Sequence, residues 1–349
     1  MRESGPRRSA ERSEDRLESL LKPYRDLSNA QIVAVWEEYA AQHTAGPFPS
    51  TRTMRENARL FTGGKRYRYA LALVGYRLLT GEPPSRGLER AATWVEWYHL
   101  YTLFLDDIMD EDVRRRTVPS AWATNAKLYR GADANRPAVV FRTRRHRYGA
   151  SQAILDALRL RSLAERAIEG AVDLPPAVRL ELLSELTRMS EAKTGRLYLG
   201  AAATAAIAAG ASSEDRAALE SFAHHFAIAF QDRDDLLGAG VVASRIGGSS
   251  EGDIRQGKRT RLYVLAMERL RPADRAAFSR AYGRGPRTTR RDVAAVRGFL
   301  RAEVLEETEK RIADHIEAAK RDLDRLPSKD PEARSLLEAL LDAQRSRER

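Results

Sequence analysis

Residues 88–109 read LERAATWVEWYHLYTLFLDDIM. Apolar and aromatic residues recur along this stretch at every third or fourth position, and the alternation typical of a β-strand is missing. The stretch therefore predicts a long helix with one buried face and carboxylates at its end. The same period recurs at 153–170, 178–199, 217–237 and 304–326.

Short segments rich in Gly and Pro separate these stretches, such as TGEPPS at 80–85 and GRGPR at 283–287. Such segments end helices and form turns. Strand signals are nearly missing, so the fold class expected is all-α, a single large bundle of long helices. We expect this helical domain at residues 16–342, between a flexible basic arm at 1–15 and a charged tail at 343–349.

The composition limits the classes of function. The chain has 349 residues, 43% of them hydrophobic, and a net charge of +11. That charge suits a nucleic acid, an anionic membrane surface or a phosphate-bearing substrate, but net charge alone favours the simpler explanation of an arginine-rich, solvated surface. The absence of cysteine excludes a disulfide framework and a thiolate metal site, and it is compatible with a reducing cytoplasm, the location we expect.

Two segments were considered as targeting or membrane elements. The N-terminal residues lack the apolar segment of a secretory signal. The stretch YLGAAATAAIAAGA at 198–211 is too short to span a bilayer. Its small residues suit close contact between helices, so we expect it inside the bundle.

The first acidic cluster contains Asp106, Asp107 and Asp110, at positions i, i+1 and i+4. Residues four apart on a helix lie on one face. Carboxylates this close repel one another, and Mg²⁺, which prefers oxygen ligands and is often held by carboxylates together with substrate phosphates, offsets the repulsion. A solvated acidic helix end is the alternative.

The second acidic cluster lies in FQDRDDLLG at 230–238 and contains Asp232, Asp234 and Asp235. Like the first, it follows a long apolar stretch, which favours a position at the mouth of a cavity. Two helices that end in carboxylates are suited to clamp a diphosphate through shared metal ions. Either cluster alone is weak evidence for such a site.

Cations flank the first cluster. Lys65 and Arg68 follow two glycines in GGKRYRY at 63–69, a spacing that suits a local anion-binding fork or an ordinary surface. Arg114, Arg115 and Arg116 follow the acidic run directly. Instead of binding phosphate, Arg115 and Arg116 are also placed to pair with the nearby Glu111 or Asp112.

Taken together, five motifs resemble, in the same order, those of the trans-isoprenyl diphosphate synthases of the polyprenyl synthetase family. The resemblance runs from about residue 60 to about residue 265 and is closest to the short-chain geranylgeranyl and farnesyl diphosphate synthases. The motifs are GGKRYR from 63, DDIMDEDVRRR from 106, KTG at 193–195, FQDRDD at 230–235 and GDIRQGKRT from 252.

The resemblance implies a helical bundle around a deep apolar cavity, usually dimeric, that transfers an allylic prenyl group onto isopentenyl diphosphate with Mg²⁺. The metal ligands it implies are Asp106, Asp107, Asp110 and Asp234, with Asp235 beside them. The residues it implies for isopentenyl diphosphate are Lys65, Arg68, His99 and Arg116. The residues it implies for the allylic diphosphate are Arg115, Lys193, Thr194, Gln231 and Lys258.

Product length in this family follows cavity depth. Tyr101, five residues before Asp106, resembles the aromatic floor of archaeal-type geranylgeranyl synthases, with farnesyl as the near alternative. The helical wheel points Tyr98 and Thr102 more directly along the aspartate face, so Tyr98 is a second candidate. Both tyrosines are equally compatible with core packing, and His99 with a satisfied core histidine.

Several positions depart from the family pattern. Gly238 stands in place of the last aspartate of the second motif, and Gly248 in place of a lysine that would face the allylic diphosphate. Ala171 replaces a glutamine, Thr117 a glycine and Tyr69 a proline. These changes keep open a weakly active enzyme or a partner subunit in a heteromer with a related synthase.

Two further alternatives differ in class. A terpene cyclase on the same bundle needs no isopentenyl diphosphate, and the intact set Lys65, Arg68, His99 and Arg116 speaks against it. A nucleic-acid binder predicts arginines and aromatics together on one exposed face. The arginines here are scattered along the sequence, so we expect no nucleic-acid partner.

Overall fold

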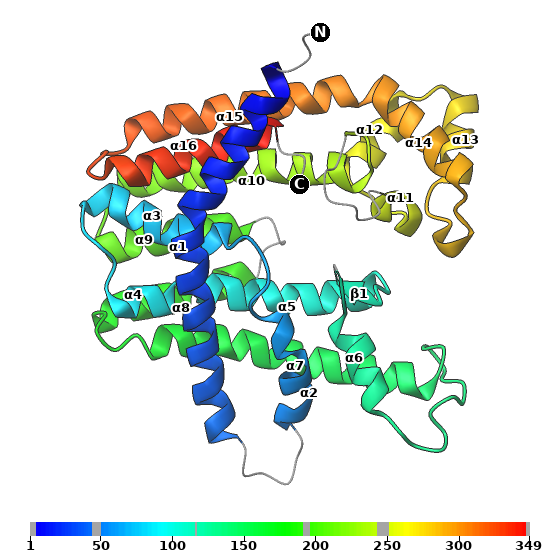
Figure 1. Ribbon diagram of the computed structural model, residues 1–349, viewed down its shortest axis with the longest axis horizontal. Coiled ribbons are helices and arrows are strands. Elements are labelled where there is room, and N and C mark those ends of the chain that lie inside the picture. Colours follow the sequence, from blue (N-terminus) through cyan, green and yellow to red (C-terminus); the bar gives the residue numbers. More distant parts are fainter. Residues whose placement is uncertain (1–4, 44–49, 116, 191–195, 243–250, 347–349) are drawn as a thin grey trace. The chain divides into compact units, whose positions relative to one another are not determined.

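A computed structural model of the chain describes residues 5–43, 50–115, 117–190, 196–242 and 251–346. The described residues form helices joined by short connections, apart from one hairpin of two-residue strands, β1 (Arg114–Arg115) and β2 (Val118–Pro119) (Figure 1). The all-α prediction is therefore confirmed. No helix within the described ranges is both long and apolar enough to cross a membrane.

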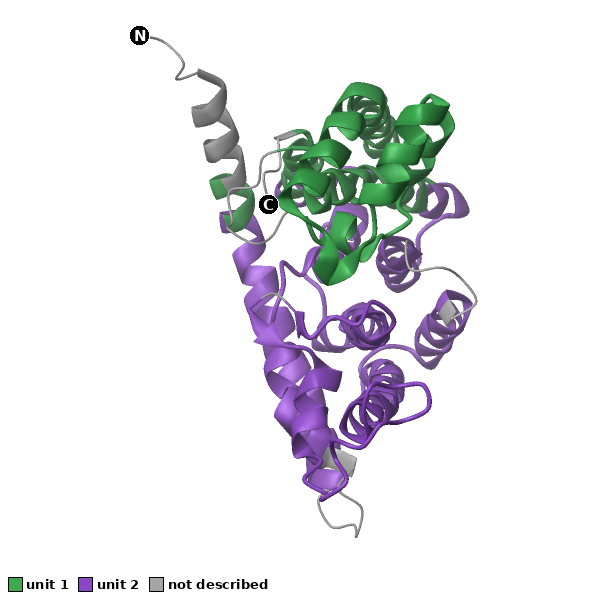
Figure 2. Cartoon of the chain, turned by 90° about the vertical axis from the view of Figure 1, so that its right-hand side faces the viewer, with its two compact units in different colours: residues 1–18, 218–326, 335–349 green, residues 19–217, 327–334 purple. Residues whose placement is uncertain are grey.

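The chain divides into two compact units (Figure 2). Unit 1 contains residues 1–18, 218–326 and 335–349, and unit 2 contains residues 19–217 and 327–334. The sequence analysis expected one helical domain between an arm and a tail. These domain bounds stay a prediction. Within the described residues, three helices each belong to both units, and the first of them begins at Gly5, in the range expected for the arm.

Unit 2 is built around a long apolar helix, α5, which packs against α7 and α6, while α3 packs against α9. The large side chains Trp94, Trp97 and Phe104 of α5 are fully buried, as the apolar period predicts. The helices that lie wholly or partly in unit 2 are α1 (Gly5–Gln42), α2 (Ser50–Asn57), η1 (Ala58–Leu60), α3 (Tyr67–Thr80), α4 (Arg86–Ala91), α5 (Trp94–Met109), α6 (Ala121–Leu128), α7 (Arg144–Glu169), α8 (Pro176–Ser190), α9 (Leu197–Ala209), α10 (Ser213–Gly238) and α16 (Pro331–Ser346).

The small-residue stretch predicted to allow close packing forms α9 and does so. A Cβ added to Gly200 would lie 2.8 Å from the Trp94 ring, so only glycine lets α9 approach α5 this closely. The same indole donates its Nε1–H to Thr204 Oγ1, at 2.9 Å. Burial of this tryptophan therefore leaves no indole N–H unpaired.

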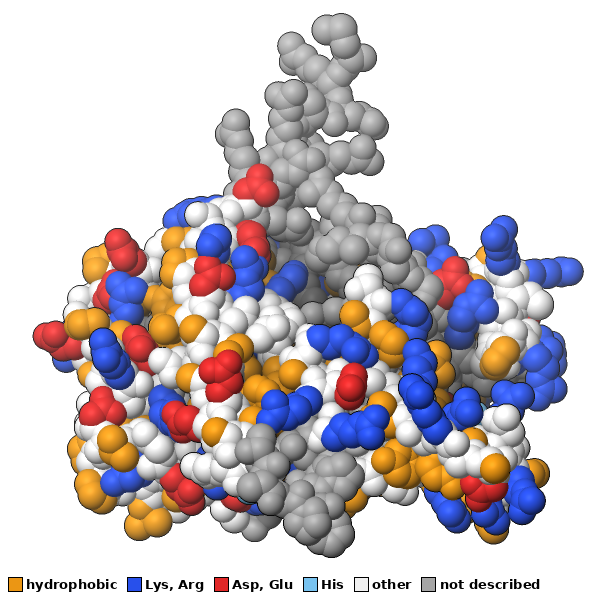
Figure 3. Space-filling view, turned by 60° about the horizontal axis from the view of Figure 1, so that its bottom comes forward, with side chains coloured by type: hydrophobic (Ala, Val, Ile, Leu, Met, Phe, Trp, Pro, Cys, Tyr) orange, Lys and Arg blue, Asp and Glu red, His pale blue; other side chains and the backbone are white. Residues whose placement is uncertain are grey.

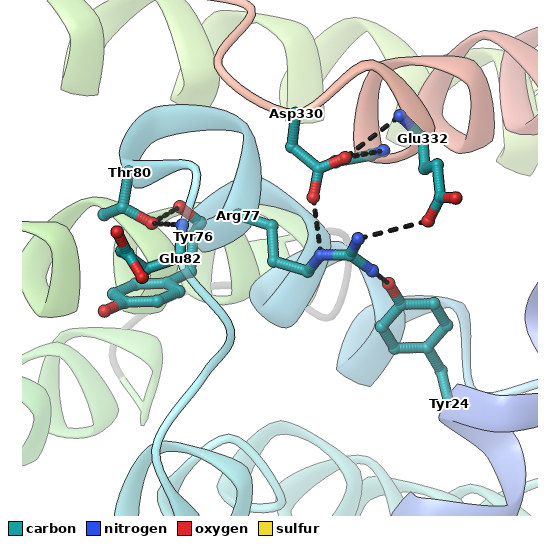
Figure 4. Close-up of polar contacts among 8 residues, drawn as sticks. Tyr24, Tyr76, Arg77, Thr80, Glu82, Asp330 and Glu332 are labelled. Atoms are coloured by element: carbon teal, nitrogen blue, oxygen red, sulfur yellow. Dashed lines mark hydrogen bonds and ion pairs between the residues drawn. The ribbon is translucent and has the colours of Figure 1, made fainter.

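Arg77 on α3 joins three separate parts of unit 2 (Figure 4). Its Nε donates to Asp330 Oδ2 at 2.6 Å, and its Nη1 donates to the hydroxyl of Tyr24 on α1 at 2.7 Å. Glu332, in the first turn of α16, accepts a longer bond from Nη2 at 3.3 Å. The short segment 327–334 is thereby fixed to helices formed near the N-terminus.

Unit 1 contains most of the chain after residue 217, together with residues 1–18. Helix α15 buries Ile312, Ile316 and Leu323 on one face, and Arg233 of α10 makes a bidentate ion pair with Glu309 of α15, both bonds at 2.7 Å. The helices that lie wholly in unit 1, beside parts of α1, α10 and α16, are α11 (Gly252–Gln256), α12 (Arg261–Arg269), α13 (Pro272–Ala281), η3 (Gly285–Arg287), α14 (Arg290–Glu303) and α15 (Leu305–Arg325).

Candidate active site

Asp106 and Asp110 lie in the last turn of α5, on one face of the helix, and both side chains are half-buried. The helix ends here because Asp110 caps it, with its N–H bonded to Asp106 O at 2.8 Å, and Glu111 follows in the left-handed region, with φ of 55°. The two carboxylates are therefore held near each other by the local backbone.

Asp107 has a different environment from its two neighbours. It is 1% exposed, and Arg115 of β1 grips it with two bonds, Nη2 to Oδ1 at 2.7 Å and Nε to Oδ2 at 3.0 Å. Trp122 donates its indole N–H to the carbonyl oxygens of Asp107 and Asp112, which holds the hairpin against the end of α5. Arg115 thus pairs with a motif aspartate, and not with Glu111 or Asp112 as the alternative interpretation proposed.

A buried ion pair, not predicted from the sequence, holds the backbone of the segment that carries Lys65 and Arg68. Arg66, with φ of 57°, lies 4% exposed and donates its Nη1–H to Glu96 Oε2 at 2.9 Å. Glu96 is the one acid within the apolar stretch from Trp94 to Leu105, a signal that marks a buried partner. The pair fixes the backbone between Lys65, which is exposed, and Arg68, which is half-buried.

Arg68 and its surroundings fit an anion site. Its guanidinium lies over the ring of Tyr198 on α9, 4.7 Å from the ring centroid. Stacking on an aromatic face holds the guanidinium plane in place, and the N–H groups at the edge of that plane can still donate hydrogen bonds to an anion. Its Nε is buried and makes no hydrogen bond. A half-buried arginine of this kind is suited to bind a diphosphate oxygen.

An aromatic series runs back along α5 from the aspartates. The ring of Tyr98 is buried and packs edge-on to Tyr101, with centroids 5.2 Å apart, and to Trp94, with centroids 6.5 Å apart. Tyr101 and His99 are half-buried. Along α5, Tyr101 lies nearer to the carboxylates than Tyr98 does. The role of either tyrosine as a cavity floor stays a prediction.

The second cluster belongs to unit 1, at the end of α10. Asp232 is buried and accepts two bonds from Arg311 Nη1, the shorter at 2.7 Å, whereas Asp234 is half-buried. Asp235 is buried and accepts a bond from Gln231 Nε2 at 2.8 Å. As in the first cluster, an arginine neutralises one aspartate while another remains partly exposed.

Asp235 carries the most perturbed carboxyl of the cluster. Burial raises the pKa of Asp235 to about 7, while the bond from Gln231 opposes that rise. The neighbouring negative charges of Asp253, Asp232 and Asp234 raise it further. A carboxyl held among like charges gains most from a bound cation.

The sequence analysis missed Asp253, which lies in the first turn of α11. Its carboxylate occupies the space beside Gly238, where an added Cβ would lie 2.2 Å from Asp253 Oδ2. A carboxylate from outside the motif thus stands where the family pattern has a longer side chain at 238. The Nζ atom of Lys258, a predicted phosphate ligand, lies 3.8 Å from Asp253 Oδ1.

The loop that carries Lys258 depends on a glycine. Gly257 has φ of +73°, and a Cβ there would lie 2.7 Å from Gly283 Cα. The two backbones cross at this point because neither residue has a side chain. Tyr282 then donates its hydroxyl proton to the carbonyl of Lys258, at 2.5 Å.

Several predicted residues lie outside the part of the chain that the structure describes. These are Arg116, Lys193, Thr194 and the substituted Gly248. Ala171 is fully buried at the end of α7, and Tyr69 is buried with its hydroxyl donating to Glu89 O at 3.1 Å. Both of these family departures therefore serve the core of unit 2.

Within the described ranges, no three Asp, Glu or His side chains gather into a metal-binding group. The two carboxylate clusters belong to different units. Each nevertheless offers carboxylate oxygens next to cationic side chains, a donor set that suits Mg²⁺ shared with phosphate oxygens. Asp106 with Asp110, and Asp234 with Asp235, are the pairs that fit this chemistry.

Comparison with known proteins agrees with this chemistry. The Polyprenyl synthetase family model matches residues 52–298. The geranylfarnesyl diphosphate synthase of Aeropyrum pernix is 30% identical over 295 residues, which are 80% of this chain and 89% of that protein. The geranylgeranyl diphosphate synthase of Sulfolobus acidocaldarius is 29% identical over 260 residues, 72% of this chain and 78% of that one.

Solved structures share the fold. The geranylgeranyl pyrophosphate synthetase of Pyrococcus horikoshii has a TM-score of 0.76 at 22% identity, over 96% of this chain and 99% of that one. A geranylgeranyl pyrophosphate synthase of Corynebacterium glutamicum, solved with isoprenyl diphosphate and magnesium, has a TM-score of 0.76 at 24% identity, over 94% and 99%. The chain therefore belongs to the polyprenyl synthetase family and is a trans-prenyltransferase of the short-chain prenyl diphosphate synthase type.

Proposed function

We propose that this enzyme condenses an allylic diphosphate with isopentenyl diphosphate in a Mg²⁺-dependent reaction, with geranylgeranyl diphosphate as the favoured product and farnesyl diphosphate next. The observation that carries the proposal is the placement of Asp106 and Asp110, half-buried on one face at the end of an aromatic helix. The relatives are named as synthases of farnesyl, geranylgeranyl and geranylfarnesyl diphosphate, which supports a short-chain product.

In the proposed reaction the allylic carbon–oxygen bond breaks, and the leaving diphosphate takes both electrons. The isopentenyl double bond attacks the resulting allylic cation, and a proton is then lost from the adduct. Bound Mg²⁺ would supply positive charge to the leaving diphosphate. On this proposal Asp106 and Asp110 of the first cluster are metal ligands, and so are Asp234 and Asp235 of the second.

The cationic side chains have separate roles in the proposal. Lys65 and Arg68 bind isopentenyl diphosphate, with His99 donating a hydrogen bond to it. Arg116 also binds isopentenyl diphosphate. The allylic diphosphate is contacted by Arg115, Lys193, Thr194, Gln231 and Lys258. Because Arg115 already grips Asp107, we assign it the additional role of fixing the end of α5.

Product length is proposed to depend on the two tyrosines of α5. Tyr101 lies five residues before Asp106, which corresponds to about 7–8 Å along the helix axis. A growing prenyl chain that starts at the aspartates meets Tyr101 first and Tyr98 next. The apolar and aromatic wall also excludes water, which would otherwise capture the cation.

The test is incubation of the purified chain with isopentenyl diphosphate, Mg²⁺ and, in turn, dimethylallyl, geranyl or farnesyl diphosphate, followed by measurement of product length. We expect products up to C20, and longer products from Tyr101→Ala. No product from any starter would contradict the proposal. Product formed only after addition of a related synthase would instead support a partner subunit in a heteromer.

We also propose a homodimer, formed through α7. Three aliphatic side chains on one stretch of this helix, Ile154, Leu155 and Leu158, are 42%, 44% and 53% exposed. Such an apolar stripe at i, i+1 and i+4 suits helix packing against a second copy. Light scattering on the purified chain should give twice the chain mass, and Leu155→Asp should give the single mass.

A further inference from the structure

The connection between α6 and α7, residues 129–143, exposes two adjacent aliphatic side chains. Val139 is 103% exposed and Val140 is 87% exposed, so neither contributes to the core of unit 2. The connection is the loop drawn beyond α6 and α7 in Figure 1. None of the proposed catalytic or binding residues lies in this loop.

The base of this loop is well held, so the exposed valines form a defined tip. The N–H groups of Arg144 and Arg145 bond to the carbonyls of Arg136 and Ala134, at 2.9 and 3.0 Å. Asp133 accepts bonds from Arg144 Nη1 at 2.5 Å and from the Tyr129 hydroxyl at 2.8 Å. The backbone on both sides of the tip is therefore fixed by the fold.

Basic side chains flank the tip on both sides. The segment 127–147 contains seven Lys and Arg residues and a single acid, Asp133, which is already paired with Arg144. The exposed members are Lys127, Arg130, Arg136, Arg142 and Arg147. Figure 3 shows one face of the molecule, on which Lys and Arg side chains lie among hydrophobic and acidic ones.

We propose that this loop docks the enzyme on an anionic lipid bilayer, with Val139 and Val140 inserted at the level of the headgroups and the flanking arginines bound to lipid phosphates. An aliphatic tip gains by leaving water for the acyl boundary. Basic residues next to it gain from the negative surface potential, and their long side chains reach the phosphates while the tip lies deeper.

The side-chain chemistry favours a bilayer over the other anionic partners. Single-stranded nucleic acid is bound by aromatic side chains on which bases stack. The two most exposed apolar side chains at this tip are valines, whereas Phe141, which follows them, is half-buried. An acidic protein surface would match the arginines but leave the valines in water at its polar rim. A bilayer satisfies both parts of the loop at once.

The experiment is flotation of the full chain with vesicles, without substrate or Mg²⁺. One set of vesicles contains phosphatidylglycerol and phosphatidylcholine, and the other contains phosphatidylcholine alone. We expect binding to the first set, weakened by salt, and at least tenfold less to the second. Because no substrate is present, the result does not depend on the proposed catalytic function.

Two matched pairs of variants locate the contact. Val139→Asp with Val140→Asp should reduce binding at least tenfold, whereas Val172→Asp, at a valine 79% exposed elsewhere in unit 2, should not. Arg136→Glu with Arg142→Glu should reduce binding likewise, whereas Arg280→Glu with Arg287→Glu, exposed in unit 1, should not. Unchanged turnover in all four would show that the variants fold.

Any one of these outcomes would overturn the proposal. The first is the absence of binding to phosphatidylglycerol vesicles. The second is equal loss in the loop variants and their controls, which would indicate a general charge effect. The third is a tighter complex with a labelled single-stranded RNA that requires the arginines but tolerates the valine changes, which would assign the loop to RNA. Another is loss of dimer mass in the valine variant, which would assign the loop to contact with a second copy of the chain.

Discussion

The two aspartate clusters look alike in sequence, yet they handle their charge differently. At the end of α5, Arg115 from the next hairpin neutralises the buried Asp107, and Asp106 and Asp110 remain half-buried. At the end of α10, Arg311 neutralises the buried Asp232, but an additional acid, Asp253, enters from another helix. The acids of the first cluster therefore all come from one local segment, whereas the second cluster also includes an acid from another helix, whose charge helps to raise the pKa of Asp235.

This difference shows that the position of an aspartate in a motif does not by itself assign its role. In each cluster one aspartate is a structural anchor for an arginine, and a neighbour is the better metal ligand. The second cluster, with its crowded acids, should depend more strongly on a bound divalent ion than the first. Three measurements break or sharpen this comparison.

The largest effect is expected at Asp106. Asp106→Ala removes one of the two half-buried carboxylates of α5, and we expect turnover to fall by about 100-fold or more because a metal that stabilises the leaving diphosphate is lost. The folded state should survive, since the Asp106 side chain is only half-buried. Steady-state kinetics and thermal unfolding of the same preparation check both statements.

Two neighbouring variants serve as contrasts. Glu111→Gln changes an exposed acid of the same run and should leave turnover within a factor of two of the parent. Asp107→Asn breaks the bond to Arg115 and should lower the free energy of unfolding by about 1–3 kcal/mol. If Asp107→Asn retained full stability while Asp106→Ala retained full turnover, the division of roles within the first cluster would be wrong.

A smaller effect is expected at Gly238, in the second cluster. Gly238→Ala places a Cβ 2.2 Å from Asp253 Oδ2, so the carboxylate of Asp253 must move away. If Asp253 supports the metal ligands, the Mg²⁺ concentration for half-maximal activity should rise about 10-fold, as is typical when an outer partner of a metal ligand is disturbed. A Mg²⁺ titration of the steady-state rate measures this.

Gly298→Ala on α14 is the matched control, because an added Cβ there meets nothing within 4 Å. It should leave the Mg²⁺ dependence unchanged and slightly stabilise the helix. A Gly238→Ala enzyme with normal Mg²⁺ dependence and a lower unfolding temperature would assign Asp253 to packing alone. That result would remove the main difference between the two clusters.

The smallest effect concerns pH and separates the helices that carry the clusters. On the buried side of α10, His225 Nδ1 lies 2.8 Å from His315 Nδ1 of α15. Burial, with the nearby charges of His225 and Arg311, lowers the pKa of His315 to about 4. Burial also lowers the pKa of His225, although Asp322, with Oδ2 3.9 Å from Nε2, opposes the shift.

A histidine whose pKa is lower in the folded state than in the unfolded state contributes its full stabilisation at pH values above its ordinary pKa of about 6.5. This contribution is lost as the pH falls toward 4. The nearby charge of His224 lowers the pKa of both histidines. Arg321 also lowers the pKa of His225, whereas Asp314 raises that of His315. Hydrogen exchange at pH 7 and pH 5, corrected for the intrinsic rate, should show lost protection in peptides of α10 and α15 but not in α5. His315→Gln should reduce the loss, and an equal loss in all three helices would contradict it.

Most of the fold could be predicted from the sequence, because helical periodicity depends on local residues. Most of the stretch 88–109 forms α5 as expected, although the structure interrupts the helix at residues 92–93, between α4 and α5. Gly200 of α9 packs against Trp94. The division into two units could not be predicted. It depends on long-range contacts, and a helix such as α10, which belongs to both units, has an uninterrupted sequence pattern.

The site was predicted in its motifs and missed in its supports. Asp106, Asp110, Lys65 and Arg68 were identified because their spacing carries chemical information. The partner of Asp107 is Arg115, but adjacent Glu111 and Asp112 were equally close in sequence, and only the hairpin geometry chooses between them. Asp253 was missed because nothing in the spacing shows that it fills the space next to Gly238.

The bonds from Arg77 to Asp330 and Glu332, together with that from the Lys329 N–H to Leu78 O at 3.2 Å, have a consequence for synthesis. The sequence separation between Arg77 and Asp330 is 253 residues, so the segment 327–334 leaves the ribosome long after α3. Unit 2 therefore stays incomplete until this segment has been translated, and the edge that it covers is available to chaperones until then. Premature termination shortly before residue 327 would leave this edge permanently open and the product a substrate for proteases.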